Sequence, residues 1–303
     1  MRTYGRAWND GNPATNPGVP LVLTPTTTIS DANNVSRNTV AEVYTQVITD
    51  LTTAEAKLPA SNGIFANKYA AAALLARVYL QQGNYPAAAA AASRVISSNR
   101  FSLNPNYGDN FLSSTSLLAN TQEDIFALQF SAQSGTNDLN TFYSQNRRAD
   151  VEIQQQFISL FEPGDDRSTL YQKVNGVYYT NKYDVLYGNI KLIRLDEMYL
   201  IRAEANFRAG TQVGAAPLGD INTIRQRAHL PALAAVTLPA ILKERRLELA
   251  FEGFRLGDVK RNMESAFDPL TNTTLPWNSP KLVFPIPLPQ INANPNLVQN
   301  AGY

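Results

Sequence analysis

The chain has 303 residues, with 26 lysines and arginines against 25 aspartates and glutamates, for a formal net charge of +1 at neutral pH. This balance excludes a general electrostatic affinity for nucleic acid or anionic lipid. There is no cysteine, which excludes disulfides, thiolate metal sites and cysteine nucleophiles. Hydrophobic residues make up 44% of the chain, which favours a globular fold.

The first predicted helix begins after a recognisable start signal. Thr39 and Glu42 have the spacing of a capping box, in which each side chain accepts a hydrogen bond from the backbone N–H of the other residue. Apolar residues then follow the helical period until Pro59, which cannot continue a helix. We therefore predict one helix between these signals.

Two alanine-rich helices are predicted next, within residues 67–99. Gly83 is expected to end the first, because glycine suits the left-handed position that follows a helix. Pro86 is expected to lie in the first turn of the second. Small side chains permit close antiparallel packing, as in a tetratricopeptide repeat, although an ordinary helical hairpin would leave the same pattern.

A second copy of the pattern favours the repeat. "ARVYLQQG" (residues 76–83) and "AEANFRAG" (residues 203–210) share an alanine at position one, a bulky apolar residue at position five and a glycine at position eight. The sequence thus predicts tetratricopeptide-like helical pairs in two portions, residues 39–99 and 194–262.

The segments outside these portions have a different character. Residues 101–190 show few helical periods and predict a loop-rich insertion. Residues 281–303 carry prolines at alternating positions and predict an extended tail without helix.

Charge is concentrated in residues 241–261, which we predict as one helix with Glu244, Glu248 and Glu252 along one face. Like charges four residues apart repel one another, so this stripe requires cations from elsewhere. The expected ion lattice combines these glutamates with arginines of the preceding helices and of the same segment: Arg194, Arg202, Arg225, Arg227, Arg245 and Arg255. We favour this structural lattice over catalysis, because glycosidic chemistry needs two carboxyls in different environments across a cleft.

The residue inventory favours a binding protein over an enzyme. The single histidine, His229, precedes Leu230 and Pro231 and has no nucleophile or carboxylate placed beside it by motif spacing. The carboxylates of residues 162–167, "EPGDDR", could hold calcium, but a solvated turn with an Asp166–Arg167 pair is the favoured interpretation. We predict no catalytic residue, metal site or cofactor.

Sugar binding requires flat aromatic faces beside polar side chains. Both tryptophans lie in polar loops, and "NDLNTFYSQNRR" (residues 137–148) has a similar mixture. The candidate ligand contacts are Trp8, Asn9, Asp10, Asn12, Tyr143, Arg147 and Trp277. Each could equally pack beneath a neighbouring loop.

Four motifs in order carry a family resemblance: "YLIRAEANFRAG", "DINTIRQRAHL", "ILKERRLELAFEGFRLGDVKR" and "PIPLPQINANPNLVQNAGY". They resemble the C-terminal signature of the SusD/RagB family, and "GVPLVL" and "FEPGDDRSTLY" resemble its central part. The resemblance implies an all-α, SusD-like fold in which residues 1–303 form a single domain that lacks the family's N-terminal part. We expect the missing helices to leave an apolar patch exposed around residues 69–95.

The resemblance also implies a function. Family members are displayed on the outer-membrane surface and capture an oligosaccharide or peptide nutrient, without chemistry, for a SusC-like TonB-dependent transporter. The alternative functions are a helical-repeat scaffold that binds a protein or peptide and, less favoured, a glycan-cleaving enzyme. No nucleic-acid partner is expected.

Overall fold

The computed structural model describes residues 3–28, 30, 34–135 and 137–303. The chain divides into two compact units, each made of segments that are distant in sequence. One unit combines Met1–Thr53, Val78–Asn84 and Gly253–Tyr303, and the other combines Ala54–Arg77 and Tyr85–Glu252. Among the described helices, none is long and apolar enough to cross a bilayer.

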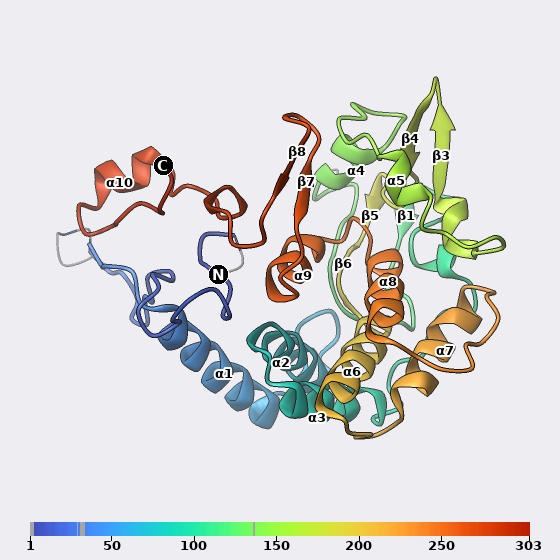
Figure 1. Cartoon of the computed structure of the whole chain (residues 1–303), viewed down its shortest axis with the longest axis horizontal. Coiled ribbons are helices and arrows are strands. Elements are labelled where there is room, and N and C mark those ends of the chain that lie inside the picture. Colours follow the sequence, from blue (N-terminus) through green and yellow to red (C-terminus); the bar gives the residue numbers. More distant parts are fainter. Residues whose placement is uncertain (1–2, 29, 31–33, 136) are drawn as a thin grey trace. The chain divides into compact units, whose positions relative to one another are not determined.

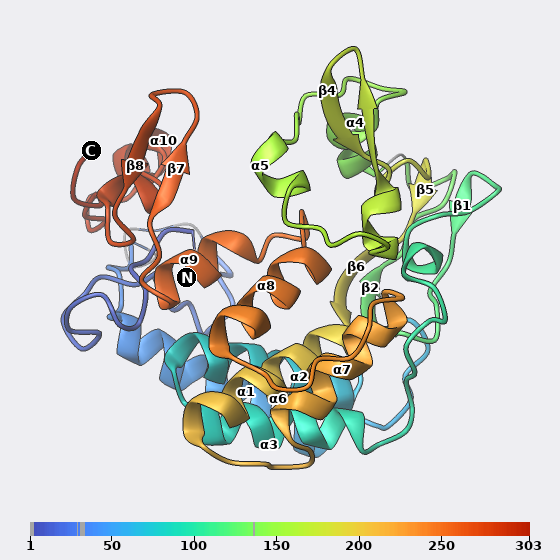
Figure 2. The same ribbon diagram turned by 45° about the vertical axis from the view of Figure 1, so that its right-hand side comes forward.

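Helices dominate the second unit (Figures 1 and 2). Helix α3 (Tyr85–Ile96) packs on α6 (Leu195–Ala209), and α6 also contacts α7 (Pro217–Arg227) and α8 (Leu238–Glu248). The close contact between α3 and α6 follows from small side chains, because most alanines of both helices are fully buried. The mostly helical architecture agrees with the predicted all-α fold.

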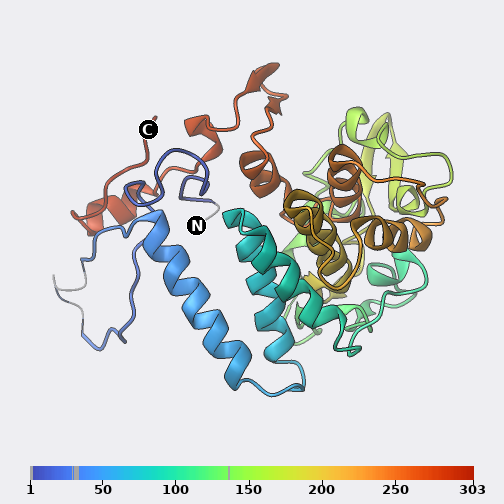
Figure 3. The same cartoon turned by 60° about the horizontal axis from the view of Figure 1, so that its bottom comes forward.

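The predicted helix boundaries near the N-terminus are confirmed. Helix α1 (Val40–Lys57), the long blue helix of Figure 3, begins with the capping box: Glu42 accepts from the Thr39 N–H at 2.8 Å, and Thr39 Oγ1 accepts from the Glu42 N–H at 3.2 Å. Helix α2 (Lys68–Gln82) ends at Gly83, whose φ is 76°, and α6 ends at Gly210, whose φ is 65°.

Short elements fill residues 101–190. These are η2 (Tyr107–Asn110), β1 (Leu117–Leu118), β2 (Asp124–Leu128), α4 (Asp138–Tyr143), α5 (Gln155–Ile158), η3 (Asp166–Leu170), β3 (Tyr171–Val174), β4 (Val177–Thr180) and β5 (Tyr187–Gly188). Strand β1 pairs with β5 in parallel, β3 pairs with β4 antiparallel, and β2 pairs antiparallel with β6 (Ile190–Arg194), which leads directly into α6. The pairing of β2 with β6 therefore holds residues 124–128 next to the strand that continues into α6.

The first unit contains α9 (Arg255–Arg261), β7 (Ala266–Asp268), β8 (Thr273–Leu275), η4 (Pro280–Leu282) and α10 (Leu288–Ala293). The prediction of a helix-free tail is wrong at α10. Pro287 is its N-cap residue and Pro289 lies in its first turn, where a helix needs no backbone N–H donor. The tail is tied to the chain's beginning, since Phe284 N donates to Thr3 O at 2.8 Å.

The single helix predicted over residues 241–261 is also wrong. Helix α8 ends at Glu248, and α9 begins at Arg255. Between them, Phe251 and Gly253 adopt left-handed conformations with φ of 64° and 82°, which interrupt the helical hydrogen bonding. Glu252 therefore lies in the turn between two helices rather than on one helical face.

The apolar patch expected around residues 69–95 is absent from the described surface. Within this range no large hydrophobic side chain is exposed, and most of the alanines are buried. The reason is that alanine presents little apolar area, and α3 buries its alanines against α6.

Gly214→Ala should destabilise the protein more than Gly210→Ala. Both glycines have positive φ, which costs alanine about 1–2 kcal/mol. At Gly210 a Cβ meets open space, whereas at Gly214 it would lie 2.5 Å from Ser93 Oγ and 2.7 Å from Arg202 Nη1. We expect an additional cost of about 1–3 kcal/mol from this crowding, measured by urea unfolding. Equal unfolding midpoints for the two variants would contradict the described packing.

Candidate functional site

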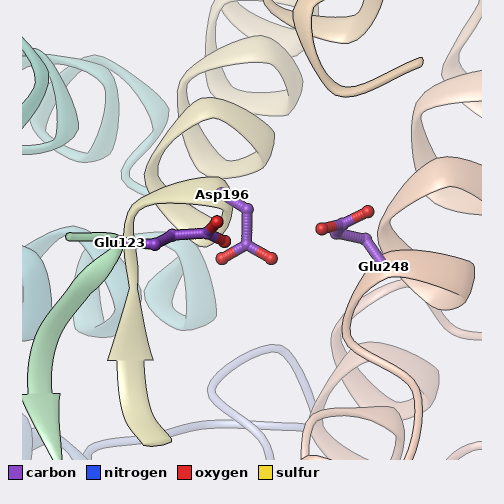
Figure 4. Close-up of side chains that lie close together, drawn as sticks. All are labelled: Glu123, Asp196 and Glu248. Carbon is purple, nitrogen blue, oxygen red and sulfur yellow. The ribbon is translucent and has the colours of Figure 1, made fainter. Parts of the chain in front are cut away.

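Three carboxylates meet in the interior of the second unit: Glu123, which precedes β2, Asp196, in the first turn of α6, and Glu248, at the end of α8. Figure 4 shows the three side chains converging from these separate elements. All three are buried, and each offers an oxygen within 4.8 Å of the others. Burial of like charges at this separation requires neutralising partners.

Arginines from the end of β6 and from α7 supply part of that neutralisation. Arg194 Nη1 lies 2.8 Å from Glu123 Oε1, and Arg227 Nη1 lies 3.1 Å from Glu123 Oε2. Arg227 also pairs directly with Glu248. Both carboxylate oxygens of Glu123 are thereby engaged by guanidinium groups, which are the most directional cationic partners available.

A third arginine reaches the cluster from η3. Arg167 is fully buried and forms two hydrogen bonds to Asp165, at 2.8 and 2.7 Å. Its Nη1 lies 2.9 Å from Glu244 and 3.3 Å from Glu248. On the other side of α8, Arg225 pairs with Glu244 at 2.6 Å. Residues of three elements thus share one continuous set of ion pairs.

The same network extends to the turn after α8. Glu252 lies 2.9 Å from Arg194 and 2.8 Å from Lys182, which also donates to Ala250 O. The Tyr107 hydroxyl donates to Glu248 O at 2.5 Å, and the Arg227 guanidinium lies 4.9 Å from the centre of the Tyr107 ring. Two residues of the segment 101–190, Tyr107 and Lys182, therefore also contact the network.

The protonation states of Asp196 and Glu248 differ. Burial raises the pKa of Asp196 well above its ordinary value, and neighbouring Glu123 and Glu248 raise it further, against the attraction of Arg194. Burial also raises the pKa of Glu248, but Arg227 and Arg167 outweigh it and hold that pKa at about 2. Burial and the neighbouring carboxylates thus favour the protonated form of Asp196, against its 2.7 Å contact with Arg194, whereas the arginines favour the ionised form of Glu248.

This arrangement suits a structural network and neither a metal centre nor a catalytic pair. The Glu123 and Glu248 oxygens that a divalent cation would use already contact arginines. The carboxylates are also fully enclosed, so no substrate can reach them.

Two arginines expected in the lattice lie elsewhere. Arg202 lies in α6, about two turns after Arg194, and there it pairs with Asp220 of α7 at 2.6 Å. Arg255 pairs with Glu264 at 2.8 Å, because the break in the helix places it at the start of α9. Arg245 is buried on α8.

Several members of the network were not expected from the sequence: Glu123, Asp165, Arg167, Lys182 and Asp196. Asp165 and Arg167 belong to "EPGDDR", for which the favoured solvated turn with an Asp166–Arg167 pair is wrong. Both side chains are buried, and Arg167 pairs with Asp165. Asp165 is also the N-cap residue of η3, where its Oδ1 accepts from the Arg167 N–H. Aspartate is a preferred N-cap residue, so the sequence contained a local indication that Asp165 contacts residue 167.

The expected ligand residue Trp8 lies in the first unit and lines a small hollow. Its ring packs edge-to-face against Tyr44, with the ring centres 5.1 Å apart. The hollow is further lined by Arg6, Gln81, Gly257 and Lys260. Trp8 is half-buried.

The polar residues that follow Trp8 are used within the protein and do not line the hollow. Asn9 donates to Arg261 O at 3.2 Å, Asp10 accepts from Arg6 at 3.3 Å, and Asn12 accepts from the Ala14 N–H at 3.0 Å. These contacts shape the loop that presents Trp8.

The remaining expected contacts divide between the two units. Trp277 is half-buried in the first unit, in the segment between β8 and η4. In the second unit, Tyr143 packs against Tyr183 with ring centres 5.0 Å apart, and Arg147 is exposed. The Trp8 hollow is therefore the place where an expected aromatic contact meets charged and amide side chains.

Comparison with known proteins gives two family matches. Residues 164–303 match the family described as the SusD family, and residues 1–80 match a family described as starch-binding associating with outer membrane. Two characterised relatives agree. The starch-binding protein SusD of Bacteroides thetaiotaomicron is 30% identical over 181 residues, which cover 46% of this chain and 31% of SusD. SusD-like protein P38 of Formosa agariphila is 25% identical over 356 residues, covering 94% of this chain and 70% of P38.

Solved structures resemble the whole chain. A candidate sugar-binding protein of Bacteroides vulgatus superposes with a TM-score of 0.85 at 30% identity, covering 100% of this chain and 73% of that protein. A SusD superfamily protein of Bacteroides thetaiotaomicron superposes with a TM-score of 0.81 at 28% identity. The match covers 99% of this chain and 74% of that protein. The chain thus spans about a third of SusD and roughly three quarters of these other relatives.

Glu248→Gln should destabilise the protein by about 3–5 kcal/mol, because Arg227 and Arg167 would lose their buried counter-charge. The matched control is Glu264→Gln, which removes the partner of the half-exposed Arg255 and should cost less than about 1 kcal/mol. Urea unfolding at neutral pH measures both. A cost for Glu248→Gln no larger than that of the control would show that the network does not stabilise the fold.

Asp196→Asn should be tolerated far better and should change the pH dependence of stability. The folded protein holds the Asp196 proton above pH 3.8, the ordinary pKa, so the natural protein loses stability as pH rises from there towards the raised pKa. The variant mimics the protonated carboxyl and lacks this loss. Its stability relative to the natural protein should therefore increase as the pH rises above 3.8, by about 1.4 kcal/mol per pH unit at most, until the raised pKa is reached. A difference that stays constant or falls would mean that Asp196 is ionised.

Proposed function

We propose that this chain, which belongs to the SusD/RagB family, binds an oligosaccharide without cleaving it. The observation that carries the proposal is the Trp8 hollow, where a half-buried indole lies beside charged and amide side chains. Indole faces bind sugar rings through their C–H groups, and polar neighbours orient the hydroxyl groups. Relatives named as starch-binding or sugar-binding support the same ligand class.

The disposition of carboxylates supports binding without hydrolysis. Glycoside cleavage requires a pair of carboxyl groups on either side of an accessible bond. The three carboxylates that converge in the second unit are enclosed, and arginines contact Glu123 and Glu248. The hollow beside Trp8 is lined by no described carboxylate side chain. Its groups are suited to holding a ligand rather than to transferring protons.

We place this binding at the outer-membrane surface, in support of uptake by a SusC-like TonB-dependent transporter. The description of the family that matches residues 1–80, starch-binding associating with outer membrane, supports this location. Release to a transporter requires moderate affinity, which a shallow aromatic contact provides more readily than a deep enclosed pocket.

Trp8→Ala should weaken oligosaccharide binding about tenfold, because loss of a stacking face worth about 1.4 kcal/mol changes the dissociation constant by that factor. Isothermal titration calorimetry with maltoheptaose and with β-glucan and xylan oligosaccharides of similar length measures the effect. Trp8→Phe keeps a flat face and should retain most of the affinity.

A different result would move or remove the site. If Trp277→Ala weakens binding and Trp8→Ala does not, the sugar contacts the segment between β8 and η4. If the chain binds none of these oligosaccharides and no acidic one, while remaining folded by circular dichroism, the proposed function is wrong. Binding of unstructured peptides in place of sugars would favour the helical-repeat scaffold.

A further inference from the structure

Three buried acceptor oxygens without a hydrogen-bond donor belong to α4 and to the turn between β4 and β5. Residues 181–184 form this turn, which is closed by the hydrogen bond from Asp184 N to Asn181 O at 3.2 Å. The Cα atoms at its two ends therefore lie within about 7 Å of each other. The oxygens are Oδ1 of Asn140, Oδ1 of Asn181 and Oδ1 of Asp184, and no described group donates to any of them. Buried acceptors are normally satisfied, so three in one region point to a missing partner.

Asn140 connects α4 to the turn and fixes the direction of its own acceptor. The residue is 2% exposed, and its Nδ2 donates to Tyr183 O at 2.7 Å and to Asp184 O at 3.1 Å. Because both carbonyl groups require the NH₂ end of the amide, the two ends of this side chain cannot be exchanged. Asn140 therefore presents an oxygen, and not a nitrogen, as its unpaired atom beside the turn.

Asp184 adds a half-buried carboxylate to these amide oxygens. Burial raises the pKa of Asp184, and a hydrogen bond from Ser144 opposes the shift, without help from any described cation. The buried carboxylates of the ion network differ in this respect, since Glu123 and Glu248 contact arginines. Asp184 thus lacks the positive partner that the other enclosed carboxylates have.

The chemistry of the three oxygens selects the class of partner. One carboxylate with two amide oxygens, and no nitrogen or sulfur ligand, is a set that hard cations prefer. Calcium binds such oxygens at about 2.3–2.6 Å in irregular geometries, whereas magnesium demands a nearly octahedral shell and keeps several waters. A calcium ion is smaller than a water molecule, so it needs less room than ordered water would. Because Asp184 is half-buried, the ion can approach from its exposed side.

We propose that Asp184, Asn140 and Asn181 bind one calcium ion, which holds α4 against the turn of residues 181–184. The ion neutralises the carboxylate and gives the amide oxygens a partner. With a single carboxylate among the ligands, the dissociation constant should be about 10⁻⁴–10⁻³ M, as in weak extracellular sites. The sequence alone does not predict this site, because Asn140 and Asp184 are 44 residues apart.

Thermal unfolding of the full chain tests the proposal. After bound metal has been removed with EGTA, about 10 mM CaCl₂, well above the expected dissociation constant, should raise the melting temperature by about 2–5 °C. The same concentration of MgCl₂ should raise it by less than half as much, because the site does not provide octahedral geometry. Isothermal titration calorimetry should show one calcium ion bound per chain.

Asp184→Asn should abolish the calcium response, because it removes the carboxylate of the set. In EGTA this variant should melt no lower than the natural chain, since it also removes a half-buried charge without an ion pair. The matched control is Glu152→Gln, which removes a negative charge at an exposed residue of the same unit and should leave the response unchanged. Asn181→Ala, which keeps the carboxylate, should weaken calcium binding by about three- to tenfold.

Three results would overturn the site. Neither a thermal shift nor calorimetric heat with calcium would show that the oxygens bind no cation. Equal shifts with calcium and magnesium would contradict the choice of ion. A full calcium response in both Asp184→Asn and Asn181→Ala would place the ion elsewhere on the chain.

Discussion

The second unit depends on keeping the ionised Glu248 inside it. This carboxylate is enclosed at the end of α8, where it pairs with Arg227 from α7 and Arg167 from η3. A buried charge of this kind is tolerable only if every partner is in place, because removing one leaves an uncompensated ion in a medium of low polarity. The positions of α6, α7, α8 and η3 are therefore not independent of one another.

That dependence explains the role of the neighbouring charges. The raised pKa of Asp196 favours its protonated form, which carries no negative charge and can donate to Glu248. Arg194 contacts Asp196, Glu123 and Glu252, and so connects the start of β2 to the turn after α8. Such a network contributes more to the choice of one register than to net stability, since apolar residues would avoid the cost of burying ions.

Sequence patterns predicted what short-range geometry determines. The capping box of Thr39 and Glu42 and the helix ends at Gly83 and Gly210 each depend on a few consecutive residues. The partners in the ion network could not be assigned this way, because Glu123 and Arg227 are 104 residues apart. A helical wheel also placed Glu252 and Arg255 on a helix that left-handed residues at 251 and 253 interrupt.

The contrast between the two polar clusters bears on function. In the network around Glu248, arginines and carboxylates pair with one another away from solvent, so the cluster gives a ligand no access. Around Trp8, a half-buried ring adjoins Lys260, Arg6 and an amide donor without a described acceptor. Buried polar groups that lack partners carry a cost to the fold, which a bound acceptor offsets. For this reason the cluster with fewer charges is the better place to expect a ligand.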